Sequence, residues 1–232
     1  MTPAITQWNQ SAQPEAGMNE EYVFGVDLDG VCADFYGKMR EIVAFWRGVP
    51  LDELTPEPDY GLGNWGVPDK REYERIHRYA VSERNLFRDL EPIPGCVQSL
   101  RRLSTEGIRI RIITHRLYIY HFHKTAVTQT AEWLDKHAIP YWDLCFMREK
   151  GHINAHIYVD DTEMHIRDLE NGGRSVIAFT NSTNVHMDPP PALRANSWAE
   201  AESIVRSRYR AWRATTNPPA PGSPDAAPPE AA

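Results

Sequence analysis

The sequence of 232 residues contains little cysteine and no long apolar run. Its three cysteines, Cys32, Cys96 and Cys145, are odd in number and far apart, which argues against a disulfide framework. A transmembrane helix needs about 18 consecutive apolar residues, and the sequence has no such stretch. The first residues also lack the basic start and apolar run of a signal peptide. We therefore expect a protein of a reducing, cytoplasmic compartment with no membrane partner.

Basic charge is in deficit as well. Lys and Arg number 25 against 32 Asp and Glu, which gives a net charge of -7 at pH 7. Binding to duplex nucleic acid or to an anionic membrane needs a basic surface, so both partners are disfavoured. A small phosphorylated ligand is not excluded, because a metal ion and a few local cations can hold it.

The two ends of the chain lack any hydrophobic pattern. Residues 1–20 are mostly small and polar, and residues 215–232 contain six Pro and five Ala. Such segments cannot bury a core. We therefore predict disordered segments at 1–20 and 214–232, with the folded part between them.

Short apolar runs alternate with helical stretches in the folded part. The runs that predict strands are 22–26, 108–113, 141–147, 155–159 and 175–179, and helices are expected at about 96–105, 124–137, 162–170 and 198–212. This alternation implies βαβ units. The predicted fold class is α/β, with a Rossmann-like core whose parallel sheet has about five strands flanked by helices.

The segment 35–91 interrupts the alternation. It is helical at about 38–47 and 69–83, and the part between is rich in Pro, Gly and aromatic residues. A solvated surface loop is the alternative, but exposed aromatic residues would gain nothing there. We therefore predict a small, mainly helical cap at 35–91 above a core formed by 21–34 and 92–213.

Polar residues follow nearly every predicted strand. They are Asp27 and Asp29, Thr114, Lys150, and Asp160 with Asp161. In an open α/β sheet the ligand crevice lies outside the carboxyl ends of the strands, so these residues are expected to meet. Carboxylate oxygens suit Mg²⁺, and Gly30 allows a tight turn. A turn or helix cap is the alternative interpretation for the acids.

Four strings carry a resemblance. Residues 27–35 read DLDGVCADF, residues 90–95 read LEPIPG, and residues 147–150 and 157–161 read MREK and IYVDD. Over about residues 22–212 the chain resembles the 5'(3')-deoxyribonucleotidase (type C 5'-nucleotidase) family of haloacid dehalogenase (HAD) phosphohydrolases. The resemblance implies hydrolysis of 5'-nucleoside monophosphates, with deoxyribonucleotides preferred, and a homodimer.

The resemblance also implies roles for the acids. Asp27 would attack phosphorus to form an aspartyl-phosphate, and Asp29 would act as acid and base. Mg²⁺ would be held by Asp27, the backbone carbonyl of Asp29 and Asp160, and Asp161 would bind the metal through water or orient Lys150.

Further residues are expected at the substrate. Gly30, Thr114, His115 and Lys150 are the predicted phosphate contacts, and Lys124 competes with Lys150 for this role. The predicted contacts to the base or the cap are Phe35, Trp65 and Arg148, while Arg116 either touches the substrate or is solvated.

One string departs from the family pattern. The family reads Thr-Ser-Pro after the second strand, whereas this chain reads Thr114-His115-Arg116. The departure leaves open another small phosphate ester as substrate, such as a sugar phosphate or a nucleic-acid end. A non-catalytic nucleotide-binding module is the remaining alternative.

Overall fold

The computed structural model describes residues 21–118 and 122–216. The predicted disorder at 1–20, and from 217 onward, lies outside the described residues. The predicted start of the tail at 214 is wrong, because helix α6 (Trp198–Thr216) continues to Thr216. None of the described helices has the length and apolar character that a membrane span requires.

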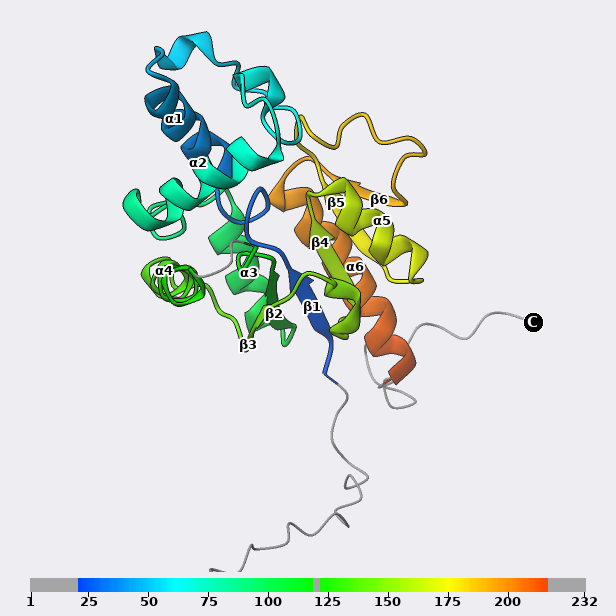
Figure 1. Ribbon diagram of the computed structural model, residues 1–232. Coiled ribbons are helices and arrows are strands. Elements are labelled where there is room, and N and C mark those ends of the chain that lie inside the picture. Colours follow the sequence, from blue (N-terminus) through cyan, green and yellow to red (C-terminus); the bar gives the residue numbers. More distant parts are fainter. Residues whose placement is uncertain (1–20, 119–121, 217–232) are drawn as a thin grey trace, which may run out of the picture.

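The centre of the protein is a parallel sheet of six strands (Figure 1). The strands are β1 (Val23–Val26), β2 (Arg109–Thr114), β3 (Asp143–Phe146), β4 (Ile157–Asp160), β5 (Val176–Phe179) and β6 (Leu193–Ala195). Their order is β3-β2-β1-β4-β5-β6. The α/β class and the parallel sheet are confirmed, but about five strands were predicted. The missed strand, β6, spans three residues and has no apolar run to mark it.

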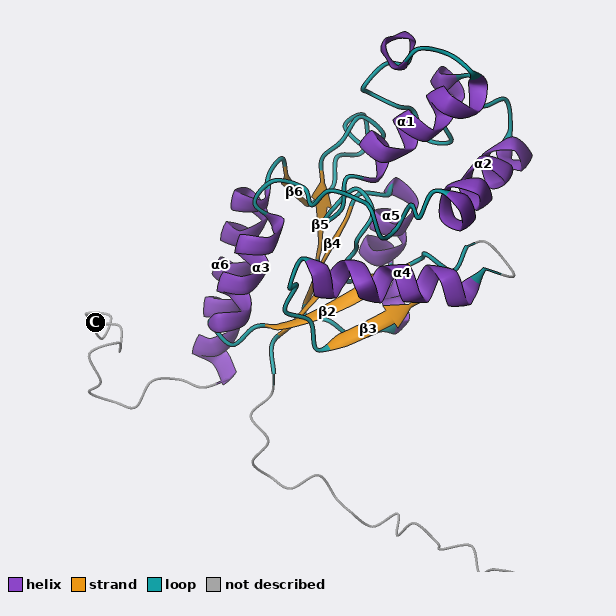
Figure 2. Ribbon diagram, turned by 90° about the vertical axis from the view of Figure 1, so that its left-hand side faces the viewer, coloured by secondary structure: helices purple, strands orange, loops and turns teal. Residues whose placement is uncertain are grey.

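Helices cover both faces of this sheet. One face is covered by α3 (Cys96–Thr105), α4 (His123–Lys136) and α6. The other face is covered by α5 (Glu163–Asn171). Neighbouring strand residues point to opposite faces, so Ile112 packs in the larger core cluster and Ile113 packs in the smaller one with α5. Figure 2 shows α3 and α6 side by side along the sheet.

Two helices form most of the segment between β1 and α3. They are α1 (Phe35–Arg47) and α2 (Lys70–Glu83), with the 3₁₀ turns η1 (Leu51–Glu53) and η2 (Gly63–Trp65) between them. Asp34 caps α1 by accepting from the Gly37 amide at 2.9 Å, and Asp69 caps α2 by accepting from Glu72 at 2.9 Å. These helices lie beyond the carboxyl end of β1, where the crevice was expected (Figure 1).

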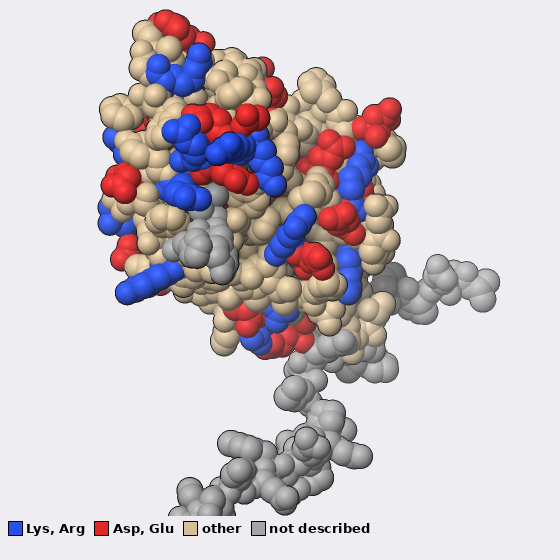
Figure 3. Space-filling view, in the orientation of Figure 1, with Lys and Arg blue, Asp and Glu red and all other residues tan. Residues whose placement is uncertain are grey.

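Charged side chains of both signs share the surface. On the face shown in Figure 3, Lys and Arg lie among Asp and Glu rather than in one continuous track. Many of these charges are paired along helices, as Lys38 is with Glu41 at 2.7 Å. This interspersed pattern is that of an ordinary solvated surface.

Candidate active site

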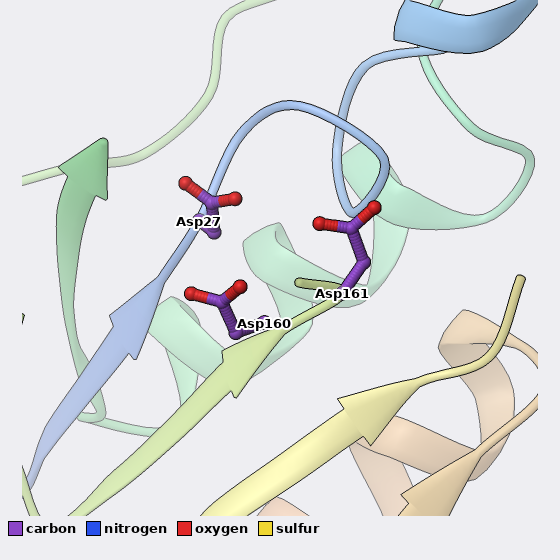
Figure 4. A group of neighbouring side chains, drawn as sticks. All are labelled: Asp27, Asp160 and Asp161. Atoms are coloured by element: carbon purple, nitrogen blue, oxygen red, sulfur yellow. The ribbon is translucent and has the colours of Figure 1, made fainter. Parts of the chain in front are cut away.

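Three acids meet beyond the carboxyl ends of the two central strands (Figure 4). In the register of β1 with β4, Val26 lies opposite Val159, which brings Asp27 level with Asp160. The Asp27 amide donates to the Val159 carbonyl at 3.1 Å and continues this pairing past the strand. Oxygens of Asp27, Asp160 and Asp161 all lie within 4.8 Å of one another, and all three side chains are buried.

Gly30 allows this approach of the acids. Its φ is +77°, and a Cβ at this position would lie 1.9 Å from Oδ2 of Asp161. Only glycine fits such a backbone without displacing the carboxylate. The Gly30 amide donates to the Ala33 carbonyl at 3.0 Å, so the predicted donation from this amide to phosphate is not supported.

Lys150 is the cation of the acid cluster. Its ammonium lies 2.8 Å from Oδ1 of Asp27 and 2.6 Å from Oδ2 of Asp160, and the side chain is buried. Burial opposes its charge, but Asp160 and Asp27 outweigh burial and raise the pKa of Lys150. Lys124, the competing candidate, is exposed on α4. The structure therefore brings Lys150, and not Lys124, to Asp27.

The pKa values of the three carboxyl groups are shifted in different directions. Burial, together with the nearby charges of Asp160 and Asp29, raises the pKa of Asp27 to about 6, against the attraction of Lys150. Burial and the charges of Asp160 and Asp27 raise the pKa of Asp161 well above its ordinary value. For Asp160, burial is outweighed by Lys150, which lowers its pKa.

The cluster is therefore short of positive charge. Among the described residues, Lys150 is the one lysine paired with these three buried carboxylates, and it pairs with Asp27 and Asp160 only, which leaves negative charge that burial makes costly. The donors are carboxylate oxygens, which suit a hard divalent cation such as Mg²⁺. Asp27, Asp160 and Asp161 are the side chains that would hold such an ion.

Thr114 adds a hydroxyl group to this edge of the sheet. The residue ends β2 and is 1% exposed, and within the described part of the chain its Oγ1 has no hydrogen-bond partner. An unpartnered buried hydroxyl costs free energy unless a ligand or water satisfies it. Its place suits the predicted phosphate contact.

His115 lies half-buried beside Thr114. Burial, followed by the charges of His165, Lys150 and Arg148, lowers the pKa of His115 to about 4. The imidazole is therefore neutral at pH 7 and can accept or donate a single hydrogen bond. Its predicted contact with phosphate stays a prediction.

The three predicted contacts to the base or the cap lie in different surroundings. Phe35 begins α1, with its ring centroid 6.1 Å from that of His77. Trp65 is fully buried inside the cap, where its indole N–H donates to the Thr55 carbonyl at 2.8 Å, so no surface of it is open to a base. Arg148 is exposed and lines a groove of about 400 Å³ beside Lys150.

Arg116 lies at the site in a role that neither of its two predicted alternatives describes. It is neither solvated nor exposed to a substrate, because its guanidinium is fully buried and its Nη2 lies 2.7 Å from Oδ1 of Asp29. The one signal in the sequence was its position two residues after Thr114, where the family pattern has proline. That position could not show which acid lies opposite.

His77 of α2 brings the cap to the same place. The side chain is buried, and burial lowers its pKa to about 4, with smaller and opposite contributions from Asp29 and Arg116. Its Nδ1 has no partner among residues 21–118 and 122–216. The Phe87 ring lies 5.7 Å from the imidazole. A neutral polar ring of the cap therefore faces the cap-side half of the site.

The sheet order, the acid after β1, the hydroxyl after β2, and the lysine and acid pair around β4 together define a HAD-type phosphohydrolase. A haloacid dehalogenase-like family hydrolase from Streptococcus pneumoniae shares this fold, with a TM-score of 0.55 and 16% identity over 81% of this chain and 99% of that one. The family described as "5' nucleotidase, deoxy (Pyrimidine), cytosolic type C protein" matches residues 21–211. The chain belongs to this family, and it is a hydrolase of phosphoric monoesters.

Two relatives differ in their sequence identity to this chain. A protein of Chlorobaculum tepidum named "Putative 5'(3')-deoxyribonucleotidase" is 51% identical over 185 residues, which cover 80% of this chain and 90% of the relative. The human protein named "5'(3')-deoxyribonucleotidase, mitochondrial" is 26% identical over 188 residues, which cover 75% of this chain and 78% of the relative. Residues 21–211, which the family matches, contain every site residue described above.

Proposed function

We propose that the protein hydrolyses 5'-nucleoside monophosphates, with deoxyribonucleotides preferred, to a nucleoside and phosphate. The proposal combines the family of the chain and the names of its relatives with one structural observation. That observation is the buried cluster of Asp27, Asp160 and Asp161, in which Lys150 pairs with Asp27 and Asp160, together with a Thr114 hydroxyl that has no hydrogen-bond partner among the described residues.

The chain's own residues supply the proposed reaction. The Asp27 carboxylate attacks phosphorus in line, and the bond from phosphorus to the ester oxygen breaks as the aspartyl-phosphate forms. Asp29 donates a proton to the departing 5'-oxygen and then takes one from the water that hydrolyses the intermediate. Lys150 and the Thr114 hydroxyl bind the phosphoryl oxygens.

The described side chains of the site do not balance the negative charge of its three carboxylates. A bound divalent cation would offset the charge of the three carboxylates and of the phosphate oxygens. Lys150 orients Asp27 through its 2.8 Å contact, which keeps the carboxylate directed at one place. The cytoplasmic location and the homodimer stay predictions.

Phosphate release tests the proposal. The purified full chain would be given ribo- and deoxynucleoside 5'- and 3'-monophosphates, sugar phosphates and 3'-phosphorylated oligonucleotides, each with Mg²⁺ and with a chelator. We expect turnover to be fastest on deoxynucleoside 5'-monophosphates and to be lost with the chelator.

Other outcomes separate the alternatives. Faster turnover of a sugar phosphate or an oligonucleotide end would replace the proposed substrate but leave the HAD chemistry intact. Nucleotide binding without turnover on any ester would indicate the non-catalytic module instead. Full activity in the chelator would remove the proposed metal dependence.

A further inference from the structure

The side of the site that faces the cap contains a buried charge that the proposed reaction does not use. The Arg116 guanidinium donates to Asp29 through Nη2 at 2.7 Å and through Nε at 3.1 and 3.2 Å. This is a two-nitrogen contact to one carboxylate, which fixes its orientation as well as its place. Within the described residues, Asp29 is the only acid for which an ion pair with Arg116 is found.

The guanidinium is itself held from three other sides. Its Nη1 donates to Oγ1 of Thr130 on α4 at 3.2 Å. Its central carbon lies 4.4 Å from the ring centroid of Phe87 and 6.0 Å from that of Trp133. The side chain therefore has little freedom, and Asp29 accepts hydrogen bonds from a fixed donor rather than a mobile one.

Stability alone does not account for an arginine at this position. An apolar side chain between Phe87 and Trp133 would fill the space without bringing a charge out of water, and buried ion pairs seldom exceed such packing in stability. The partner of the buried charge is also the acid that must reach the leaving oxygen. A small displacement of such a group costs much of the rate.

We propose that Arg116 is a positioning residue that holds the Asp29 carboxylate toward the ester oxygen of the substrate. Arg116 would act through Asp29 and not by touching the substrate. This inference rests on the proposed acid and base role of Asp29. It also assigns a use to the departure of Thr114-His115-Arg116 from the family pattern.

The leaving group of the substrate provides a selective test. An alkyl phosphate ester needs a proton on its departing oxygen, whereas p-nitrophenyl phosphate releases a stable anion without one. We expect Arg116→Met to lower kcat/KM about 10²-fold on the best alkyl ester of the substrate panel, and much less on p-nitrophenyl phosphate. Arg116→Lys, which keeps the charge but loses the two-nitrogen contact, is expected to recover part of the loss.

A double-mutant cycle tests whether the effect passes through Asp29. In an Asp29→Asn background, Arg116→Met should change kcat/KM by less than about threefold, because the carboxylate that it positions is gone. If Arg116→Met is unstable, Thr130→Val removes the Nη1 acceptor, together with the donation of this hydroxyl to the Ala126 carbonyl within α4, and should give a smaller loss with the same dependence on leaving group. Arg102→Met is the matched control, because Arg102 pairs with buried Glu202 between α3 and α6, away from Asp29.

Several results would overturn the inference. Equal losses on both ester types, a loss confined to KM, or a full loss in the Asp29→Asn background would show that Arg116 supports the fold or binds substrate itself. Unchanged kinetics of Arg116→Met with an inactive Asp29→Asn would reject the inference alone. Unchanged turnover of Asp29→Asn would instead reject the proposed role of Asp29.

Discussion

Asp27 and Asp29 lie two residues apart, yet each is bound by a different cation from a different part of the chain. Asp27 is buried between β1 and β4, and it shares Lys150 with Asp160 at 2.8 and 2.6 Å. Asp29 is a quarter exposed on the side facing the cap, and its partner is Arg116 from the loop after β2. The core half of the site, around Asp27, therefore concentrates negative charge, whereas the half that faces the cap pairs Asp29 with the fixed cation of Arg116. This division suits the proposed roles, because Asp27 as nucleophile needs its charge neutralised and Asp29 as acid needs a fixed orientation.

Removing the proposed nucleophile, Asp27, is expected to have the largest effect. Asp27→Asn keeps the shape of the side chain but cannot form the aspartyl-phosphate, so turnover should fall more than about 10³-fold. Phosphate release and circular dichroism would be measured together, because the fold should be retained. The control is Asp135→Asn on the exposed face of α4. Comparable turnover in Asp27→Asn would mean that Asp27 is not the nucleophile.

Lys150→Gln should damage both stability and activity. The change leaves the Asp27 and Asp160 carboxylates buried without their shared cation, which costs about 3 to 5 kcal/mol of unfolding free energy. Urea unfolding would measure this loss, and added Mg²⁺ should restore part of it. Lys136→Gln, at an exposed position of α4, is the matched control. A variant as stable as the parent without metal would contradict the charge balance inferred for the core half.

Thr114→Val separates activity from stability. The hydroxyl has no hydrogen-bond partner in the part of the chain that the structure describes, so its loss should leave stability unchanged or slightly improved. As a phosphate donor it should contribute to the rate, and kcat/KM is expected to fall about 10²-fold. The same change at exposed Thr105 should alter neither quantity. A destabilised variant with normal kinetics would assign Thr114 to the fold instead.

The effect of His77→Gln should appear in the pH dependence of stability. The pKa of His77 is about 4 in the folded protein and 6.5 in the unfolded chain, so the unfolded state binds more protons between these values. The contribution of neutral His77 is therefore complete above pH 6.5 and declines by up to about 3 kcal/mol as the pH falls toward 4. Unfolding free energies of the variant should decline less over this range.

The contribution of Asp27 to stability should depend on pH with the opposite sign to the contribution of His77. The pKa of Asp27 is raised to about 6, so its contribution is present below pH 3.8 and is lost as the pH rises through 6.

His152→Gln is the control for the His77 experiment, because His152 is exposed. Parallel curves for the parent and His77→Gln would show that His77 is not held neutral in the folded protein.

The elements of the core could be predicted because their signals are local. Each central strand is a short apolar run, and its carboxyl end is marked by Asp27, Thr114 or Asp160. The rule that strand ends of a parallel sheet share one edge then brings distant residues together. The short strand β6 was missed because its three residues, two half-buried and one buried, form no such run.

The contacts within the site were less accessible to prediction. Trp65 is interior to the cap because its indole finds a carbonyl there, which no spacing in the sequence reveals. The Gly30 amide donates within its own turn, whereas the sequence predicted only that this glycine allows a tight turn. In each case the partner depends on a folded loop rather than on the residue itself.

By itself, the sequence determined the α/β class, the order of the acid, hydroxyl, lysine and acid pair along the chain, and the edge of the sheet where they meet. It could do so because apolar periodicity and strand direction are encoded by neighbouring residues. Only the tertiary structure decided that Lys150 serves both Asp27 and Asp160, and that Arg116 lies against Asp29, 87 positions away. Such pairing depends on which side chains share one buried volume, where an unpaired charge is too costly to remain.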